Sequence, residues 1–539
     1  MRRIFATLLA GFMLNPGLIG ATPQNEKYGG TATPIKHVVV IFQENVSFDH
    51  YFGSYPNALN LKGEPWFHAA PGTPTVNGYG PALLTFNPNL NPANGTGASN
   101  PFRLAPSQAS TADQDHDYTP EQQAFDGGVM DLFPKYTGAG GTASGGTGTP
   151  PIFNTTGLVM GYFDGNTVTA FWNYAQHFAI NDSSFDTNFG PSTPGALNLI
   201  SGQTNGAINN VNGTGALVGD GNGGYTVNSD ADPNGDVCST STGERFDMNG
   251  KNIGDLLNAA GVSWGFFEGG FDLTVTNSNG TTGCKRTTTS TVTGITKADY
   301  IPHHQPFQYY ASTANPTHTR PASVLEIGHD GPANHQYDTH DFFDAVKQGN
   351  FPAVSFLKAP GYQDGHAGYS DPLDEQTFIV NVINFLMTTP EWQNTAVIIN
   401  YDDSDGWYDH QIGPIVNQSQ TAADELTGPG LCGQSTTNIL AGTTASSAQG
   451  RCGYGPRLPY VVVSPFAKSN FVDHTTTDQT STIRFIEDNW LGGQRVGNGS
   501  FDAIAGTITN MFDFENCRNE DGIVILNPST GQIQRQYGW

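Results

Sequence analysis

Positive charge is scarce in this chain. It carries 22 Lys and Arg against 48 Asp and Glu over 539 residues, which gives a formal net charge of −26. Long-range electrostatics therefore repels nucleic acid and anionic membrane surfaces, and we expect no nucleic-acid partner. Charged residues of both signs make up only 13% of the chain. An acidic surface of this kind suits a protein that works below neutral pH.

Long apolar runs are also absent beyond the N-terminus. No segment after residue 21 has the roughly 18 uninterrupted apolar residues that a membrane-spanning helix needs, so we expect no transmembrane segment. The first residues include Arg2 and Arg3, then an apolar run over 4–14, then small residues at Gly20 and Ala21. This order is typical of a secretory signal peptide, which we place at 1–21. The mature protein is expected to be exported, either to the periplasm or into the medium.

Cysteine is infrequent, and its five positions match no zinc-binding spacing. In an exported chain five cysteines allow two disulfides and one free thiol. Two pairs bracket polar stretches, so we predict the disulfides Cys238–Cys284 and Cys432–Cys452, with Cys517 left free. Other connectivities, or reduced cysteines, are open alternatives at this point.

Continuous Val/Ile-rich runs predict strands that are buried on both faces of a parallel sheet. They lie at 37–42, 353–357, 395–400 and 460–464. Helical apolar stripes at 374–387 and 480–490 alternate with these runs. We therefore predict an α/β fold, with a mostly parallel central sheet flanked by helices.

Gly, Asn, Thr and Pro are concentrated in a few segments that we interpret as loops or insertions. The main ones lie near 62–112, 202–243 and 274–297. We predict that they interrupt a single catalytic domain that covers residues 22–539. Whether they form a separate cap over the site is open, and the sequence does not determine the oligomeric state.

Polar residues directly after the apolar runs are the first candidates for a site, because ligands of open α/β sheets bind beyond the carboxyl ends of the strands. Glu44 and Asn45 follow the first run, Asp402 and Asp403 follow the third, and His366 lies after the second. Three crowded carboxylates repel one another, and a divalent cation relieves that repulsion. Oxygen ligands suit Mg, Ca or Mn, with Zn and Fe as further options. The alternative is that each acid caps a turn on its own.

Ser192 precedes the apolar run 196–200, which predicts a helix with Thr193 as its N-cap. The Ser192 hydroxyl then lies at a helix N-terminus, where backbone N–H groups and the helix dipole favour an anion. The alternative is an ordinary turn serine between two prolines.

Four histidines are candidates for the groups that bind phosphate oxygens. His303 and His304 are adjacent between prolines, and His116 lies among aspartates. Together with His366 they are candidates to bind phosphate oxygens. We therefore predict a phosphoryl-transfer site in which Ser192, also a metal ligand, attacks phosphorus, a histidine protonates the leaving alkoxide, and water hydrolyses the phosphoserine.

The run QENVSFDHYFG at 43–53 resembles the signature of a bacterial phosphoesterase family that contains secreted acid phosphatases and phospholipases C. Further matches lie at 190–194, 302–307, 364–366, 401–410 and 457–465. The resemblance implies an alkaline-phosphatase-like α/β fold with Ser192 as nucleophile. It also implies one metal ion and several phosphate contacts. The implied metal ligands are Glu44, Asn45, Asp402 and Asp403, and the implied phosphate ligands are His116, His303, His304 and His366.

Two residues separate this chain from the phospholipase branch of that family, which tends to have Arg at the position of Val46 and Thr at that of Ser192. Gly195 also replaces an Asn that many members carry. We therefore predict a broad-specificity acid phosphatase that acts on small phosphate esters. The alternative is a phospholipase C that cleaves at a phospholipid headgroup. A third hypothesis, a non-catalytic binding protein, leaves the acids and histidines unexplained.

Overall fold

The computed structural model describes residues 28–140, 151–221, 223–426, 431–432, 450–515 and 522–537. The predicted signal peptide at 1–21 and Cys517 lie outside the described residues. Within them, no helix is both long enough and apolar enough to cross a membrane.

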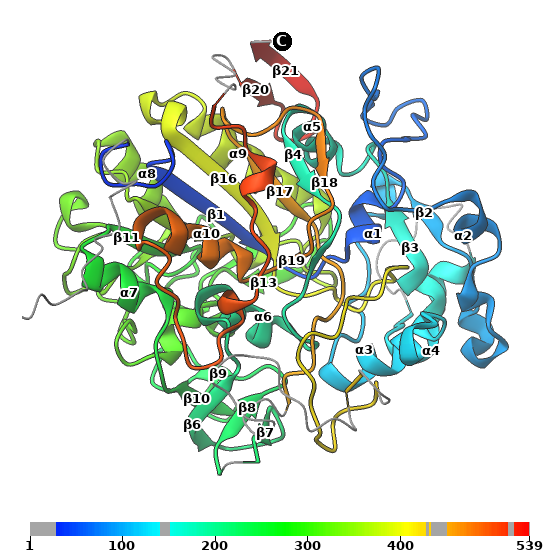
Figure 1. Ribbon diagram of the computed structural model, residues 1–539, viewed down its shortest axis with the longest axis horizontal. Helices are drawn as coiled ribbons and strands as arrows, with labels where there is room; N and C mark the ends of the chain where they lie inside the picture. The colour runs from blue at the N-terminus through cyan, green and yellow to red at the C-terminus, as the bar shows by residue number, and fades with distance from the viewer. Residues whose placement is uncertain are drawn as a thin grey trace, which may run out of the picture.

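An eight-stranded sheet forms the centre of the molecule, with the order β14-β11-β15-β1-β16-β17-β4-β18 (Figure 1). The four strands predicted from apolar runs all belong to it, as β1 (His37–Gln43), β15 (Val354–Lys358), β16 (Thr395–Tyr401) and β17 (Tyr460–Val463). The other four strands are β4 (Ala179–Asn181), β11 (Trp264–Glu268), β14 (Gln336–Asp338) and β18 (Phe471–Asp473).

The central sheet is mostly parallel, but β17 runs against both of its neighbours, β16 and β4. The prediction of four parallel strands was therefore wrong for this one. A continuous apolar run reports that both faces of a strand are covered, and it carries no information on the direction of the strand. The pairs β1–β15, β1–β16, β11–β15, β11–β14 and β4–β18 are parallel as expected.

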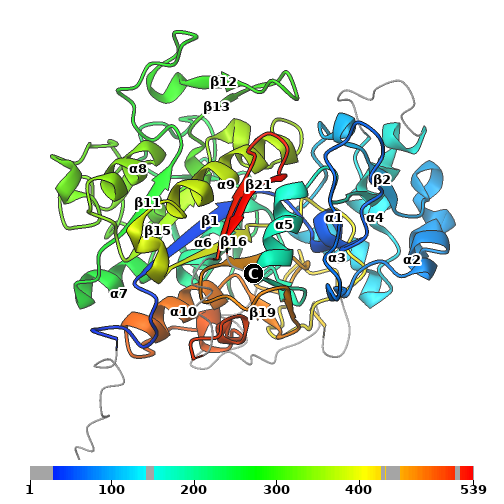
Figure 2. The same ribbon diagram turned by 90° about the horizontal axis from the view of Figure 1, so that it is seen from above.

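Helices cover both faces of the sheet, which explains why Val38, Val39 and Val40 of β1 are fully buried. Figure 2 shows α8 (Thr339–Lys347) and α9 (Pro372–Leu386) on one side, and α7 (Ile253–Ala260) and α10 (Ser481–Trp490) on the other. α6 (Ser192–Ser201) packs against α7 and α10. α5 (Thr169–His177) packs against β4 and β17.

A group of short elements lies beside the central sheet, at the right of Figure 1. It contains the parallel pair of β2 and β3 together with four short helices. These elements are α1 (Phe48–Phe52), α2 (Pro81–Thr85), β2 (Phe102–Leu104), α3 (Tyr118–Phe125), α4 (Phe133–Tyr136) and β3 (Gly161–Phe163).

All three segments predicted as loops contain strands, and β2 lies in the segment 62–112. The segment 202–243 supplies most of a second, five-stranded sheet, and 274–297 contributes to the hairpin β12–β13. The polar strands were missed because their Asn-, Thr- and Gly-rich composition hides the two-residue apolar alternation of a half-buried strand. They are β6 (Asn205–Val211), β7 (Leu217–Gly219), β8 (Tyr225–Val227), β9 (Asp232–Pro233), β10 (Arg245–Met248), β12 (Thr287–Thr289) and β13 (Thr296–Ala298).

Two small pairings complete the described structure. One is parallel and joins two-residue strands, of which β19 packs on α10, and the other is a C-terminal antiparallel hairpin that packs on α9. The strands are β5 (Ser184–Phe185), β19 (Thr477–Asp478), β20 (Ile523–Leu526) and β21 (Ile533–Tyr537).

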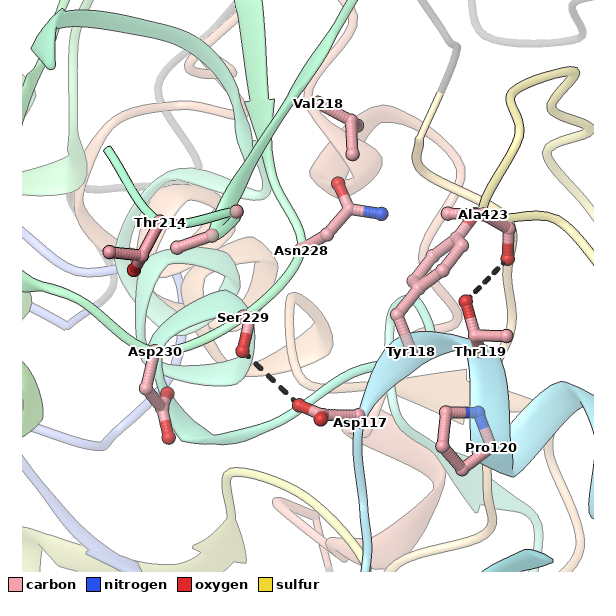
Figure 3. Close-up of a pocket in the computed structure, with 12 residues that line it drawn as sticks. Asp117, Tyr118, Thr119, Pro120, Thr214, Val218, Asn228, Ser229, Asp230 and Ala423 are labelled. Carbon is pink, nitrogen blue, oxygen red and sulfur yellow. Dashed lines mark hydrogen bonds between the residues drawn. The ribbon is translucent and has the colours of Figure 1, made fainter. Parts of the chain in front are cut away.

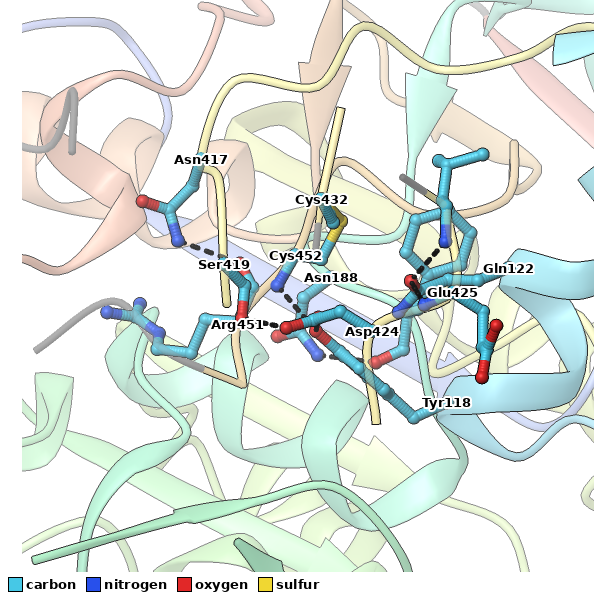
Figure 4. Close-up of a disulfide and its surroundings, with 12 residues drawn as sticks. Tyr118, Gln122, Asn188, Asn417, Ser419, Asp424, Glu425, Cys432, Arg451 and Cys452 are labelled. Carbon is cyan, nitrogen blue, oxygen red and sulfur yellow. Dashed lines mark hydrogen bonds between the residues drawn. A yellow bond between two sulfur atoms is a disulfide. The ribbon is translucent and has the colours of Figure 1, made fainter. Parts of the chain in front are cut away.

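Both predicted disulfides are present, Cys238–Cys284 and Cys432–Cys452. Figure 4 shows the second one beside the start of α3. The Tyr118 hydroxyl accepts a hydrogen bond from the Cys452 N–H at 3.0 Å and donates one to Asp424 at 2.6 Å. The disulfide-bonded segment is therefore fastened to the helix that begins two residues after His116.

Candidate active site

Three parallel strands bring the first group of polar residues together. Gln43 of β1 is paired with Tyr401 of β16. Glu44 and Asp402 directly follow these two strands, so they lie side by side at one edge of the sheet. β15 ends at the same edge with Lys358. The loop after β15 returns to this edge, because the Glu44 N–H donates to the Asp364 carbonyl oxygen at 2.9 Å.

Ser192 is the first residue of α6, and Pro191 occupies the N-cap position without a capping side chain. The expectation that Thr193 caps the helix was wrong, because Thr193 lies inside the first turn. Its N–H donates instead to Asp230 Oδ1 at 2.8 Å. A carboxylate from the segment before β9 thus satisfies one of the free N–H groups at this helix end.

The Ser192 hydroxyl lies between two carboxylates. Its Oγ is 3.0 Å from Glu44 Oε2 and 3.1 Å from Asp403 Oδ2. All three side chains are buried, with Ser192 only 2% exposed. Glu44 and Asp403 are separated from Ser192 by 148 and 211 positions in the sequence, and both contact its hydroxyl oxygen.

Asn45 and Asp402 each direct one unsatisfied oxygen into the same region. The Asn45 N–H donates to Asp402 Oδ1 at 2.9 Å, which fixes the two side chains relative to each other. Asn45 Oδ1 and Asp402 Oδ2 are buried and accept no hydrogen bond from any described residue. A buried polar atom without a partner is destabilising, and a cation supplies the missing interaction. These two oxygens, with the carboxylates of Glu44 and Asp403, therefore fit the donor set of a hard divalent cation.

The electrostatics of the cluster are consistent with a missing positive charge. Burial and the neighbouring Asp402 raise the pKa of Glu44 well above its usual range, and the same two causes raise the pKa of Asp403. Lys358 Nζ forms an ion pair with Glu44 Oε1, and His116 is a second group that brings positive charge next to Asp403. These two groups do not balance the three carboxylates of Glu44, Asp402 and Asp403, so the cluster has capacity for a cation.

His116 borders the cluster through Asn45. Its Nε2 is 3.2 Å from Asn45 Nδ2, and its Nδ1 is 2.9 Å from the Gln114 carbonyl oxygen and 3.5 Å from Asp405 Oδ1. Burial lowers the pKa of His116, but Asp403 and Asp405 outweigh it and raise the pKa well above the ordinary value. The imidazolium form is therefore favoured at this position.

The other three predicted histidines lie around the same cluster. His304 Nδ1 is 3.3 Å from Glu44 Oε1, and the His303 ring makes an edge contact with the His304 ring at 4.6 Å. The His366 ring makes an edge contact with His116 at 6.0 Å. Burial lowers the pKa of both His304 and His366, so these two favour the neutral form. All nine predicted site residues thus belong to one connected group, while their catalytic roles stay a prediction.

Comparison with known proteins agrees with this group of residues. Residues 35–491 match the model of the phosphoesterase family. The chain belongs to the phosphoesterase family. This match confirms the resemblance that the sequence motifs indicated.

Several curated relatives of this phosphoesterase are named phospholipase C. A non-hemolytic phospholipase C of Pseudomonas aeruginosa is 26% identical over 513 residues, which cover 93% of this chain and 60% of the relative. A non-hemolytic phospholipase C of Burkholderia pseudomallei is 26% identical over 550 residues, with 95% and 65% covered. Phospholipase C A of Mycobacterium tuberculosis is 25% identical over 563 residues, with 99% and 89% covered. The chain therefore spans less than two thirds of the first two relatives.

The phosphoesterase site contains residues that the sequence analysis missed. Lys358 is one. It is the last residue of β15 and directly follows the apolar run 353–357, so inspection of the residues after each run was sufficient to find it. Asp364 and Asp405 are others. Asp405 Oδ1 accepts a hydrogen bond from Asn45 Nδ2 at 3.3 Å, and burial raises the pKa of Asp364 to about 7.

Among the described residues, three groups bring one ligand atom from each of three side chains within 4.8 Å of one another: Asp113–His116–His366, Asp49–Asp409–His410 and Asp236–Cys238–His318. The first borders the cluster described above. In the second, Asp49 and Asp409 already bind Arg457, and the third contains a disulfide-bonded cysteine. Glu44, Asp402 and Asp403 do not form such a group, so their role as metal ligands stays a prediction.

Gly195 allows α6 to approach the strand-end loop closely. A Cβ at this position would lie 2.1 Å from the Asp402 carbonyl oxygen and 2.6 Å from its carbon. We expect Gly195→Ala to displace Ser192 from Asp403 and to lower kcat by about 100-fold, because misplacement by about 1 Å has effects of that size. Steady-state kinetics with an aryl phosphate measures this.

The control for this substitution is Gly80→Ala, because a Cβ at Gly80 meets nothing within 4 Å. It is expected to leave kcat unchanged. Wild-type kcat in Gly195→Ala would show that α6 and the Asp402 loop are not held in this contact.

Proposed function

We propose that this chain is a metal-assisted phosphoric ester hydrolase with Ser192 as its nucleophile, and that its activity is of the phospholipase C type. The single observation that carries the proposal is the position of the Ser192 hydroxyl, within 3.1 Å of both Glu44 and Asp403. The family match and the phospholipase C relatives support the choice of phosphoric esters.

Glu44, Asn45, Asp402 and Asp403 are the residues that would hold one divalent cation, because they carry the carboxylate oxygens and the two unsatisfied atoms of the cluster. When bound, the cation supplies positive charge that favours deprotonation of Ser192 and stabilises negative charge on the phosphoryl oxygens.

The residues of this chain account for each step of an in-line displacement. Ser192 Oγ forms a bond to phosphorus while its proton passes to the carboxylate of Glu44 or Asp403. The bond from phosphorus to the ester oxygen breaks, and that oxygen takes a proton from His116. Water then forms a bond to phosphorus and gives a proton to the neutral His116, the bond to Ser192 Oγ breaks, and Ser192 Oγ takes a proton back from Glu44 or Asp403. His303, His304 and His366 are proposed to hold phosphate oxygens.

His116 is the proposed general acid, because Asp405 and Asp113 lie 3.5 and 3.9 Å from its Nδ1 and stabilise the imidazolium. A general acid matters most when the leaving alkoxide is a strong base. We expect His116→Gln to lower kcat about 100-fold or more for glycerol phosphate, and by a smaller factor for p-nitrophenyl phosphate. His329→Gln, an exposed histidine, is the control. Equal losses on both substrates would assign His116 to phosphate binding alone.

A phosphomonoesterase activity, including an acid phosphatase, is the second candidate. The observation that favours it is Lys297, whose Nζ lies 3.6 Å from the centre of the Tyr369 ring. Tyr369 in turn stacks on His366, and the Lys297 ammonium forms no ion pair or hydrogen bond with the described residues. A free ammonium at this place favours a substrate with an additional negative charge, such as a phosphomonoester dianion.

The test of the proposed function combines substrate choice with removal of metal. Purified protein is assayed with phosphatidylcholine and phosphatidylethanolamine in mixed micelles, and with p-nitrophenyl phosphate, before and after chelation. We expect diacylglycerol release from the lipids, loss of at least about 100-fold on chelation, and recovery with one equivalent of a divalent cation. Hydrolysis of the monoester alone would favour the second candidate. Full activity after verified metal removal would contradict the proposal that a divalent cation assists catalysis.

We also propose that the α/β architecture is of the alkaline-phosphatase-like type and that the protein is exported. The placement of Ser192 at the N-terminus of α6, beyond the ends of parallel strands, supports the first point. The two disulfides support the second, because disulfides persist in oxidising compartments.

A further inference from the structure

A cavity of about 350 Å³ opens near the N-terminal turn of α6. Figure 3 shows it between residues 117–120 at the start of α3, the segments 214–218 and 228–230 of the five-stranded sheet region, and Ala423. Two of its lining residues adjoin residues of the candidate active site. Asp230 accepts the Thr193 N–H, one residue after Ser192, and Asp117 follows His116 directly. The cavity is therefore close enough in the fold to be considered as a subsite for part of an ester bound at Ser192.

Asn228 is the feature of this cavity that needs a ligand. It is only 5% exposed, and neither its Oδ1 nor its Nδ2 forms a hydrogen bond with any described residue. Its side chain points into the cavity in Figure 3. A buried amide without partners destabilises the fold, so a ligand group that both donates and accepts hydrogen bonds would be favoured here.

The charges around the cavity exclude an anionic ligand. Asp117 and Asp230 are its only charged lining residues in the described part of the chain. The Ser229 hydroxyl donates to Asp117 Oδ1 at 3.1 Å, which leaves the other Asp117 oxygen available as an acceptor. The cavity thus offers acceptors to a ligand that carries O–H or N–H donors.

The remaining wall suits the carbon skeleton of a small alcohol. Pro120, Ala216 and Val218 present apolar groups. Tyr118 contributes its ring alone, because its hydroxyl is bonded to Asp424 and to the Cys452 N–H. The cavity therefore combines apolar contacts with acceptors at one end and the Asn228 amide at the other.

We propose that this cavity is the subsite for the headgroup alcohol, which stays bonded to phosphorus when diacylglycerol leaves, and that it takes a hydroxyl- or ammonium-bearing headgroup, such as glycerol or ethanolamine, in preference to choline. The inference rests on the proposed function, since it assumes that phosphorus lies at Ser192. A trimethylammonium group has no N–H to donate and leaves the acceptors of Asp117 and Asn228 unused. In a soluble glycerol or ethanolamine phosphate the same alcohol is the leaving group and occupies another position at phosphorus, so the two kinds of substrate are compared in the test.

The test compares kcat/KM for phosphatidylethanolamine and phosphatidylglycerol with that for phosphatidylcholine in the metal-loaded wild-type protein, and then in Asn228→Leu. The wild type is expected to prefer the two donor headgroups. In Asn228→Leu the ratio of donor headgroups to choline is expected to fall about tenfold or more, mainly through KM. Asn210→Ala, an exposed asparagine on β6, is the control and is expected to keep the wild-type ratio.

A second variant changes Val218, another residue that lines the cavity, and keeps the inference testable if Asn228→Leu fails to fold. Val218→Phe fills part of the cavity and is expected to raise KM for phosphatidylethanolamine and phosphatidylglycerol, and to leave KM for ethanolamine phosphate, whose alcohol is the leaving group, unchanged. This result would support the headgroup subsite. An equal rise in KM for ethanolamine phosphate would place the leaving alcohol in the cavity and would overturn the headgroup subsite.

The outcomes separate this inference from the function on which it rests. Hydrolysis by the wild type with an unchanged headgroup ratio in both variants would overturn the subsite and leave the hydrolase intact. A wild type that prefers phosphatidylcholine would also overturn it. A wild type without hydrolysis of any phosphate ester would overturn the proposed function together with the subsite.

Discussion

Ser192→Ala is expected to lower kcat for every phosphate ester substrate by at least about 10⁴-fold, because it removes the atom that bonds to phosphorus. The Ser192 hydroxyl is the only group of the described residues that contacts Glu44 Oε2 and Asp403 Oδ2 together. A methyl group at this place neither attacks phosphorus nor donates to either acid. Single-turnover kinetics with p-nitrophenyl phosphate measures the loss, and acid-quenched protein analysed by mass spectrometry shows whether a phosphoserine forms at 192.

The matched control keeps the hydroxyl. Ser192→Thr is expected to retain measurable turnover and to trap phosphate at the same position, since the added methyl group leaves an alcohol oxygen on the same carbon. Circular dichroism and thermal unfolding of both variants establish that α6 is intact. Wild-type turnover in a folded Ser192→Ala variant would remove Ser192 from the mechanism and with it the proposed function.

Arg457→Met is expected to reduce the free energy of unfolding by about 3–5 kcal/mol, as loss of one partner of a buried ion pair does. Arg457 is fully buried, and its guanidinium donates to Asp49 Oδ1 at 2.9 Å and to Asp409 Oδ2 at 3.1 Å. It also donates to the carbonyl oxygens of Asn77 and Asp182. Methionine preserves the apolar stem but leaves Asp409 without its cation, and Asp49 with His410 as its one remaining ion-pair partner among the described residues. Urea denaturation followed by tryptophan fluorescence measures the change.

Two further variants test the cause of this loss. Asp409→Asn in the Arg457→Met background is expected to recover part of the stability, because it removes one of the uncompensated charges. Lys285→Met, an exposed cation, is expected to change the free energy of unfolding by less than about 0.5 kcal/mol. An Arg457→Met variant as stable as the wild type would show that the network does not stabilise the fold.

The ion pairs of Arg457 with Asp49 and Asp409 explain why three of the family motifs contain these charged residues. Asp49 comes from the run 43–53, Asp409 from the run 401–410 and Arg457 from the run 457–465. None of the three contacts Ser192 in the described structure. Instead they join α1 to the loop after β16, the same loops that carry Asn45 and Asp403. Part of the motif signal is therefore structural, and it holds the chemistry-bearing loops in place.

Residues whose role follows from local position were predictable from sequence. Glu44 and Asp402 directly follow Val/Ile-rich runs, and parallel strands end at one edge of a sheet, so their proximity followed from the α/β prediction. The disulfide pairs were predicted because each pair brackets one polar segment. Lys358 obeyed the same strand-end rule and was missed because the search was for acids and histidines.

Features that depend on contacts between distant segments were not predictable. Asp230 reaches the N-terminus of α6 from a segment interpreted as a loop. The direction of β17 is set by its partners β16 and β4 and leaves no mark in an apolar run. Asn228 gave no signal at all, because an isolated asparagine in a polar stretch has no periodicity or spacing to distinguish it.

The sequence by itself determined the α/β class, the buried strands and the set of acids and histidines, since each of these follows from hydrophobic periodicity or from position along the chain. Only the tertiary structure decided which cysteines pair, that the Ser192 hydroxyl lies between Glu44 and Asp403, that Arg457 binds Asp49 and Asp409, and that a cavity opens near the N-terminal turn of α6. Hydrogen bonds and ion pairs act over a few ångströms in space, and the distance between two residues along the chain does not determine which of them come that close.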